Sequence, residues 1–175
     1  SLTSCFIFYN ALSSSFNQIP FFTISFGDTT LFPKNKVDKR FGFREIILEQ
    51  DITEISKKVA IDKGYKDSGL VIYNVTDKKF KIYKGCNLED IFFLTYNDKV
   101  LSIIISTKST DPNCILKMLK KLYGECSTCL EAPTNRFTWV GQNATVSYQV
   151  NSGRTITSIS SNKLELEYDK YKSSK

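Results

Sequence analysis

Four cysteines between residues 86 and 129 are the residues best suited to chemistry. Cys86, Cys114, Cys126 and Cys129 form an even set, and the last two make a C-x-x-C motif. Such a motif forms a redox centre when it lies at the N-terminus of a helix. It serves a zinc site when a second ligand pair has knuckle spacing. In an oxidising compartment it belongs to a disulfide framework. The choice depends on the elements that position the cysteines.

The C-x-x-C motif follows a predicted helix over residues 111–123, which begins at Asp111-Pro112 and stops at Gly124. The thiols therefore lie away from a helix N-terminus, and the electrostatics disfavour redox catalysis. Cys86 and Cys114 lack zinc-knuckle spacing. Disulfides are the favoured interpretation; a four-cysteine zinc site and free buried thiols are the alternatives.

Geometry restricts the disulfide pairing. Cys114 and Cys126 lie at opposite ends of the predicted helix, which is about 18 Å long, and a disulfide needs Cα atoms within roughly 7 Å. Two pairings remain: Cys86–Cys114 with Cys126–Cys129, or Cys86–Cys126 with Cys114–Cys129.

The rest of the composition argues against most catalytic classes. The chain has no histidine, so a Ser–His or Cys–His pair cannot form within it. No phosphate-binding loop or complete metal-ligand set is present in the sequence, and we expect neither a cofactor nor an enzyme. The net charge of +6 comes from lysine rather than arginine, which disfavours nucleic-acid binding.

The predicted elements define an α+β fold. Helices are expected over residues 51–60 and 111–123, and strands over 41–49, 70–75, 80–83, 90–96, 100–107, 136–140, 144–150, 155–160 and 164–168. Residues 70–75 and 80–83 are expected to form one hairpin, and 90–96 and 100–107 another. The fold is thus an antiparallel sheet of about seven to nine strands with two short helices on one face. A looser copy of the pattern in the first half suggests two α/β halves.

The order of a helix, Tyr123-Gly124, a loop, Thr138-Trp139 and further strands resembles that of small bacterial envelope domains. Over residues 41–168 the cadence is similar to that of β-lactamase-inhibitor-like proteins and small outer-membrane assembly lipoproteins, although those have two helices before each set of strands. The resemblance implies a non-enzymatic, protein-binding role in the bacterial envelope.

Residues 1–19 carry no charge, and residues 2–12 are apolar. Small residues follow at 13–15, as in the hydrophobic region and cleavage zone of a secretory signal. The stretch is too short to span a bilayer. We expect a signal-peptide remnant over 1–19, a single domain over 20–168, a polar tail over 169–175, and a periplasmic or secreted location. Two alternatives are a buried first strand and a lipid anchor at Cys5; the apolar residues after Cys5 argue against the anchor.

We therefore expect an exported protein-binding domain of the inhibitor, immunity or envelope accessory type. Trp139, Lys117 and Lys121 are the candidate contact residues, although core packing is the stronger interpretation of Trp139 and a solvated helix face that of the two lysines. The alternative function is a small-ligand carrier or an enzyme with a histidine-free site between sheet and helices.

Overall fold

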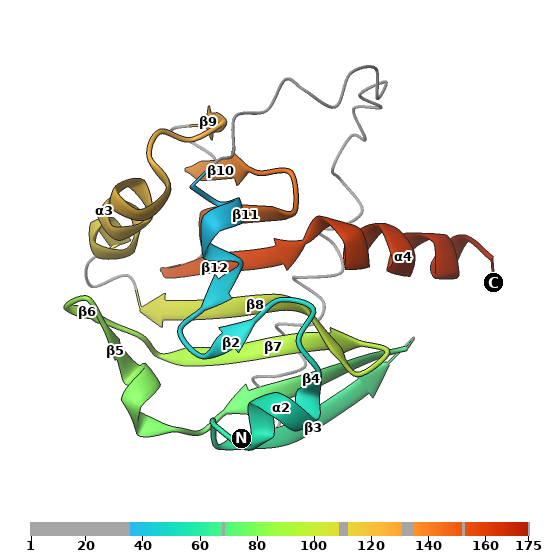
Figure 1. Cartoon of the computed structure of the whole chain (residues 1–175). Coiled ribbons are helices and arrows are strands. Elements are labelled where there is room, and N and C mark those ends of the chain that lie inside the picture. The colour runs from blue at the N-terminus through green and yellow to red at the C-terminus, as the bar shows by residue number, and fades with distance from the viewer. Residues whose placement is uncertain (1–35, 68, 109–111, 131–134, 152, 175) are drawn as a thin grey trace. The chain divides into compact units, whose positions relative to one another are not determined.

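The structure is a computed structural model that describes residues 36–67, 69–108, 112–130, 135–151 and 153–174. The predictions for residues 1–19, for Cys5 and for the first part of the domain fall outside these ranges. Within the described ranges the predicted α+β class is confirmed (Figure 1).

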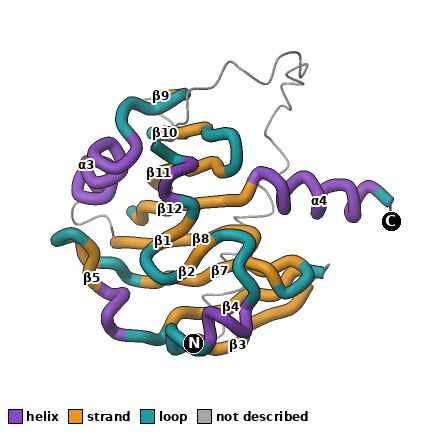
Figure 2. The backbone as a smooth tube through the Cα atoms, viewed as in Figure 1, coloured by secondary structure: helices purple, strands orange, loops and turns teal. Residues whose placement is uncertain are grey.

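An eight-stranded sheet forms the centre of the fold (Figure 2). Every neighbouring pair of its strands is antiparallel. In spatial order its strands are β3 (Ile61–Asp67), β4 (Leu70–Val75), β7 (Asp90–Tyr96), β8 (Lys99–Lys108), β12 (Arg154–Ser161), β11 (Ala144–Asn151), β10 (Arg136–Val140) and β9 (Thr128–Leu130). The pairing of β8 with β12 joins the first four strands to the last four. Strands from both halves of the chain thus contribute to one continuous sheet.

The β7–β8 hairpin is the predicted hairpin that the structure reproduces most closely. Tyr96 pairs with Lys99, and the two residues between them, Asn97 and Asp98, have φ values of 51° and 60°. Both angles suit the type I′ turn that short hairpins prefer, and Asn and Asp tolerate them well.

One face of the sheet and helix α3 (Pro112–Tyr123) make the main core. Apolar side chains recur at helical spacing in α3, which places Ile115, Leu119 and Leu122 on one buried side. They pack in the same cluster as Phe93 and Ile103 of the central strands. The helix predicted for residues 111–123 is confirmed over its described part.

Two small hairpins lie outside the large sheet. The first pairs β1 (Gly42–Phe43) with β2 (Ile46–Ile47), after the short 3-10 helix η1 (Asp38–Arg40). The second pairs β5 (Ile82–Tyr83) with β6 (Cys86–Asn87), after the 3-10 helix η2 (Lys78–Lys81). The predicted pairing of residues 70–75 with 80–83 is wrong, because β4 pairs with β3 and β7 instead.

The first helix is shorter than predicted. Helix α2 spans Ile52–Ser56, and the carboxylate of Asp51 caps it by accepting a hydrogen bond from the backbone N–H of Thr53 at 2.9 Å. Two hydrogen bonds from Thr53 lower the pKa of Asp51. The bond from the Thr53 hydroxyl has the larger effect, and the bond from its backbone N–H has the smaller one. Lys63 and Gly64, which follow the predicted helix, lie inside β3, where the register with β4 shifts between Lys63 and Lys66.

The strand predicted for residues 164–168 is also wrong, because helix α4 spans Asn162–Ser173. Ser161 caps it by accepting a 3.2 Å hydrogen bond from the backbone N–H of Leu164. Leu164 is buried with Tyr96 and Leu101 in a second, smaller cluster, against which Tyr168 and Tyr171 pack. The helix continues through most of the stretch that the sequence assigned to a polar tail.

Candidate functional site

The four candidate cysteines form two disulfides, in the first of the two predicted pairings. Cys86 bonds Cys114 with an S–S distance of 2.05 Å and a sequence separation of 28, and Cys126 bonds Cys129. The first bond ties the β5–β6 hairpin to the first turn of α3. Cys86 is 3% exposed, so this bond lies within the core.

Trp139 is part of the core. Its side chain is 1% exposed, and its indole N–H donates a 2.9 Å hydrogen bond to the carbonyl of Gly124. Its ring centroid lies 6.2 Å from that of Tyr123 in α3. The core interpretation of Trp139 therefore fits the structure, and this side chain offers no surface to a partner.

Lys117 and Lys121 are exposed on α3. They follow Cys114 by three and seven residues, so all three lie along one side of the helix. Cys114 on that side is bonded to the β5–β6 hairpin. The two lysines thus extend along α3 from the point where this hairpin is attached.

The hairpin itself carries a cationic and aromatic surface that the sequence-based prediction missed. Residues 78–84 contain four lysines and no acidic residue, interleaved with Phe80, Ile82 and Tyr83. Ile82 is 59% exposed, so an aliphatic side chain lies among the lysines at the surface. The available signal was this alternation of lysines with apolar side chains, which in the sequence is indistinguishable from an ordinary amphipathic strand.

Arg44 connects the two small hairpins. Its guanidinium group lies 5.1 Å from the ring centroid of Tyr83 and 5.2 Å from that of Phe80, and it donates a hydrogen bond to the carbonyl of Ile82. Such stacking is the cation–π geometry that arginine favours. The planar group is thereby held in one orientation while its residue remains exposed.

Three lysines complete the surface. Lys84 lies 5.8 Å from the centre of the Tyr83 ring. Lys79 forms ion pairs of 3.4 Å with both Glu45 and Asp77, and Lys81 donates to the carbonyl of Glu89. We define the basic hairpin surface by the following residues: Arg44, Lys79, Lys81, Ile82, Tyr83 and Lys84.

A buried aromatic layer supports this surface. Phe43 is 5% exposed and Phe80 is 1% exposed. The rings of Phe43 and Tyr83 pack edge to face, with centroids 4.7 Å apart. Burial raises the pKa of Tyr123 in α3 to about 12, with nearby Tyr83 adding to the rise and Arg40 opposing it. Tyr83 packs against the core cluster that contains Tyr123, so the exposed groups lie over buried aromatic rings.

The backbone at both hairpin tips is unusual. Arg44 has φ of 54° and Lys84 has φ of 49°. This left-handed region disfavours side chains with a Cβ and is normally occupied by Gly, Asn or Asp. Tight hairpin turns require such φ values, so the uncommon feature of these two tips is a cationic residue in place of Gly, Asn or Asp; Glu49, elsewhere in the chain, also has a positive φ of 63°.

The basic hairpin surface thus combines four cations, the aromatic ring of Tyr83 and the exposed aliphatic side chain of Ile82. Within the described ranges there is no cluster of three or more His, Cys, Asp or Glu residues suited to a metal ion. Nor does any helix in that part of the chain have the length and apolar character needed to cross a membrane.

Comparison with known proteins does not identify a relative. No protein-family model matches the chain, and no curated protein sequence or solved structure is significantly similar to it.

Proposed function

We propose that this chain is an exported, non-enzymatic domain that binds an acidic surface of another protein through its basic hairpin surface. The observation that carries the proposal is the position of Arg44 and Lys84 at the tips of adjacent hairpins, each in a left-handed backbone conformation. Unfavourable backbone conformations that persist in a fold are concentrated at functional sites.

The composition of the surface supports a protein partner. Interface centres are enriched in arginine and tyrosine and contain exposed apolar side chains that become buried on binding. Ile82 and Tyr83 supply such a centre, and the cations around them supply charge complementarity to an acidic partner. Nucleic acid is less favoured, since Arg44 is the single arginine among the six residues of this surface.

The disulfides support export. Two bonds among the four candidate cysteines fit an oxidising compartment. Together with the apolar, signal-like stretch over residues 2–12, they favour the periplasm or the extracellular space. An inhibitor, an immunity protein or an envelope accessory factor would have these properties.

The alternative of a small-ligand or catalytic site between sheet and helices has less support. The side chains that face each other there are apolar and buried, including Ile115 and Leu119 of α3 and Ile103 of β8. Ligand sites instead combine a cavity with a few convergent polar groups.

The decisive experiment compares three immobilised full-length proteins: the wild type, the double variant Arg44→Glu/Lys84→Glu, and the control Lys170→Glu. Each is exposed to extracytoplasmic proteins of the source organism and washed at increasing salt. A protein retained by the wild type and the control, but lost with the double variant, supports the proposal. Equal retention on all three proteins contradicts it.

In a second experiment, the wild-type chain is applied to a column that carries immobilised duplex DNA. Retention of the wild-type chain at low salt, with steep loss as salt rises, would favour nucleic-acid binding over the proposal. Circular dichroism of all variants shows whether a loss of binding follows from unfolding.

A further inference from the structure

The Cys126–Cys129 disulfide differs in its surroundings from Cys86–Cys114. Cys126 lies in the loop after α3, and Cys129 lies in the edge strand β9, all three residues of which are exposed. Cys126 is partly buried, whereas Cys129 is exposed. One sulfur of this pair therefore belongs to an exposed residue, while Cys86 of the other pair is only 3% exposed.

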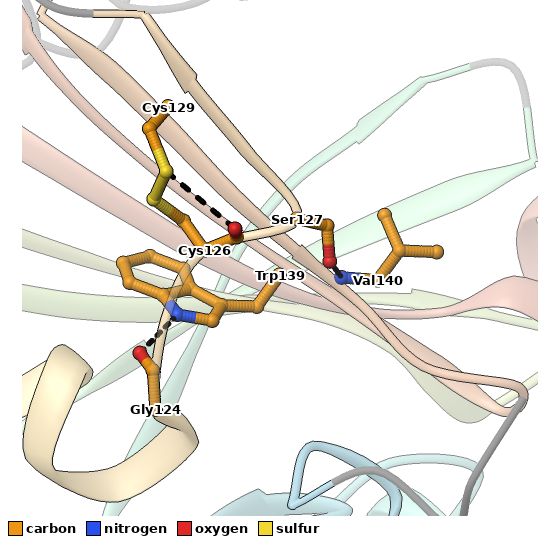
Figure 3. The surroundings of a disulfide bond; sticks show 6 residues. All are labelled: Gly124, Cys126, Ser127, Cys129, Trp139 and Val140. Atoms are coloured by element: carbon orange, nitrogen blue, oxygen red, sulfur yellow. Dashed lines mark hydrogen bonds between the residues drawn. A yellow bond between two sulfur atoms is a disulfide. The ribbon is translucent and has the colours of Figure 1, made fainter.

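Hydrogen bonds that do not involve sulfur hold the backbone around the pair, and Figure 3 shows two of them, Ser127 with Val140 and Trp139 with Gly124. The N–H of Ser127 donates to the carbonyl of Thr138 at 2.7 Å, and the hydroxyl of Ser127 accepts from the N–H of Val140 at 3.0 Å. The indole of Trp139 donates to the carbonyl of Gly124, just before the loop. These three bonds would hold the loop in place when the S–S bond is open.

Strand pairing fixes the other cysteine in the same way. Cys129 lies opposite Phe137 in the β9–β10 ladder, and Thr128 lies opposite Thr138. Both sulfurs would therefore stay close in the dithiol state, so the bond can reform without a search through unfolded conformations.

We propose that Cys126–Cys129 is a site of reversible thiol–disulfide exchange with an exposed dithiol protein, whereas Cys86–Cys114 is a structural bond. This assignment does not depend on the proposed binding function. It also differs from a thioredoxin-type redox centre, because the pair here follows a helix and lies at a sheet edge. In this exchange the chain is the substrate of a dithiol partner.

The exchange is balanced in two steps. A thiolate of the partner attacks Sγ of Cys129, forming a mixed disulfide and releasing Cys126 as a thiolate, which takes a proton from water. The partner's second thiolate then attacks the partner's own sulfur in the mixed disulfide and releases Cys129 as a thiolate, which is also protonated. Two electrons pass to this chain, and the partner's dithiol becomes a disulfide.

The first experiment equilibrates the oxidised full-length chain in buffers of increasing reduced-to-oxidised dithiothreitol ratio. Acid quenching, alkylation and peptide mass spectrometry then measure each cysteine pair separately. We expect Cys126–Cys129 to reach half reduction at a ratio at least about tenfold lower than Cys86–Cys114. The pair should reform on return to oxidised dithiothreitol, with an unchanged far-ultraviolet circular dichroism spectrum. Reduction of both pairs at one ratio, or only with unfolding, would overturn the proposal.

The second experiment tests which sulfur is attacked. A purified thioredoxin-fold protein whose second C-x-x-C cysteine is replaced by serine can form the mixed disulfide but cannot resolve it. We expect this probe to be trapped on Cys129 of the wild-type chain, as identified by peptide mapping. Trapping on Cys126, or no adduct beyond that formed by the double variant Cys126→Ser/Cys129→Ser, would contradict the assignment.

Discussion

The carboxylate of Asp38 accepts a 2.7 Å hydrogen bond from the backbone N–H of Asn143, which lies 105 residues further along the chain. Its other oxygen accepts from the N–H of Gln142 at 2.9 Å. The turn between β10 and β11 is thus capped by a side chain from η1. A Cβ at Gly141 would lie 2.5 Å from Oδ1 of Asp38, so this contact leaves no room for a side chain there.

Removing this carboxylate should destabilise the protein. We expect Asp38→Ala to lower the free energy of unfolding by about 1–3 kcal/mol, because two backbone donors lose their partner. Asp38→Asn keeps one acceptor oxygen and should lose less. Urea denaturation followed by circular dichroism measures both. Equal stability of the wild type and Asp38→Ala would show that the turn does not depend on this carboxylate.

The two disulfides should differ in their contribution to stability. In the loop-entropy account, a bond with a separation of 28 residues restricts the unfolded chain more than one with a separation of 3, by about 2 kcal/mol. The double variant Cys86→Ala/Cys114→Ala should therefore unfold at a lower urea concentration than Cys126→Ala/Cys129→Ala under oxidising conditions. The reverse order would contradict the assignment of Cys86–Cys114 as the structural bond.

Lys84→Gly separates stability from binding. Glycine adopts the φ of 49° found at this position without the steric cost of a Cβ, so we expect the midpoint of thermal unfolding to be unchanged or higher. Binding of the captured partner should weaken, because the cation beside Tyr83 is lost. Calorimetry and titration measure the two effects. A variant that is less stable, or that binds as tightly as the wild type, would argue against a functional reason for lysine here.

The second half of the sheet was predictable from the sequence because its signals are local. The strands over residues 136–140, 144–150 and 155–160 alternate cleanly and are separated by short links rich in Gly, Asn and Ser. The structure has β10, β11 and β12 at nearly the same bounds. Helix α3 was predictable for the same reason, since Pro112 and Gly124 mark its limits.

The basic hairpin surface was not predictable because it depends on tertiary contacts. Nothing near residue 82 in the sequence indicates that Arg44, which lies 38 positions away, donates to the Ile82 carbonyl. Phe80 has the pattern of a strand residue, but it lies in η2 and is buried against the β1–β2 hairpin. The exposure of Ile82 follows from this arrangement, because β5 pairs with β6 and lies outside the large sheet.

In helix α4 the apolar pattern was visible in the sequence, but it was assigned the two-residue period of a strand instead of the period of a helix. Leu164 and Glu165-Leu166 suggest strand alternation, yet Leu164, Tyr168 and Tyr171 recur at the i, i+4, i+7 spacing of a helix face. The segment forms a helix because Ser161 provides an N-cap and because Tyr96 provides a surface for the two tyrosines. The ring centroid of Tyr96 lies 5.4 Å from that of Tyr168 and 5.9 Å from that of Tyr171.

Ser161→Ala should destabilise this helix. The hydroxyl of Ser161 accepts from the N–H of Leu164 and donates to the carboxylate of Glu49 at 2.6 Å. Loss of an N-cap costs about 0.5–2 kcal/mol, and we expect a value in the upper part of that range because the second bond is lost as well. Hydrogen exchange of residues 164–168 should accelerate in the variant. Unchanged exchange there would mean that packing of the tyrosines alone maintains the helix.

Glu165, in the first turn of α4, should make stability depend on pH. Burial raises the pKa of its carboxyl above the ordinary value of 4.5, the charge of Asp169 adds to the rise, and a hydrogen bond with Ser160 opposes it. The folded protein therefore holds this proton more tightly than the unfolded chain does. Stability falls as pH rises from about 4.5 through the folded pKa, because ionisation then favours the unfolded state.

Glu165→Gln removes this titration and keeps a similar shape. We expect the variant to be more stable than the wild type above the folded pKa of Glu165, and the difference should shrink as pH falls towards 4.5. Asp169→Asn, which removes the neighbouring charge, should lower the pKa of Glu165 and move the transition to lower pH. Urea midpoints measured between pH 4 and pH 8 test both variants. A stability difference between wild type and Glu165→Gln that is constant across this range would show that the carboxyl of Glu165 titrates alike in the folded and unfolded chains.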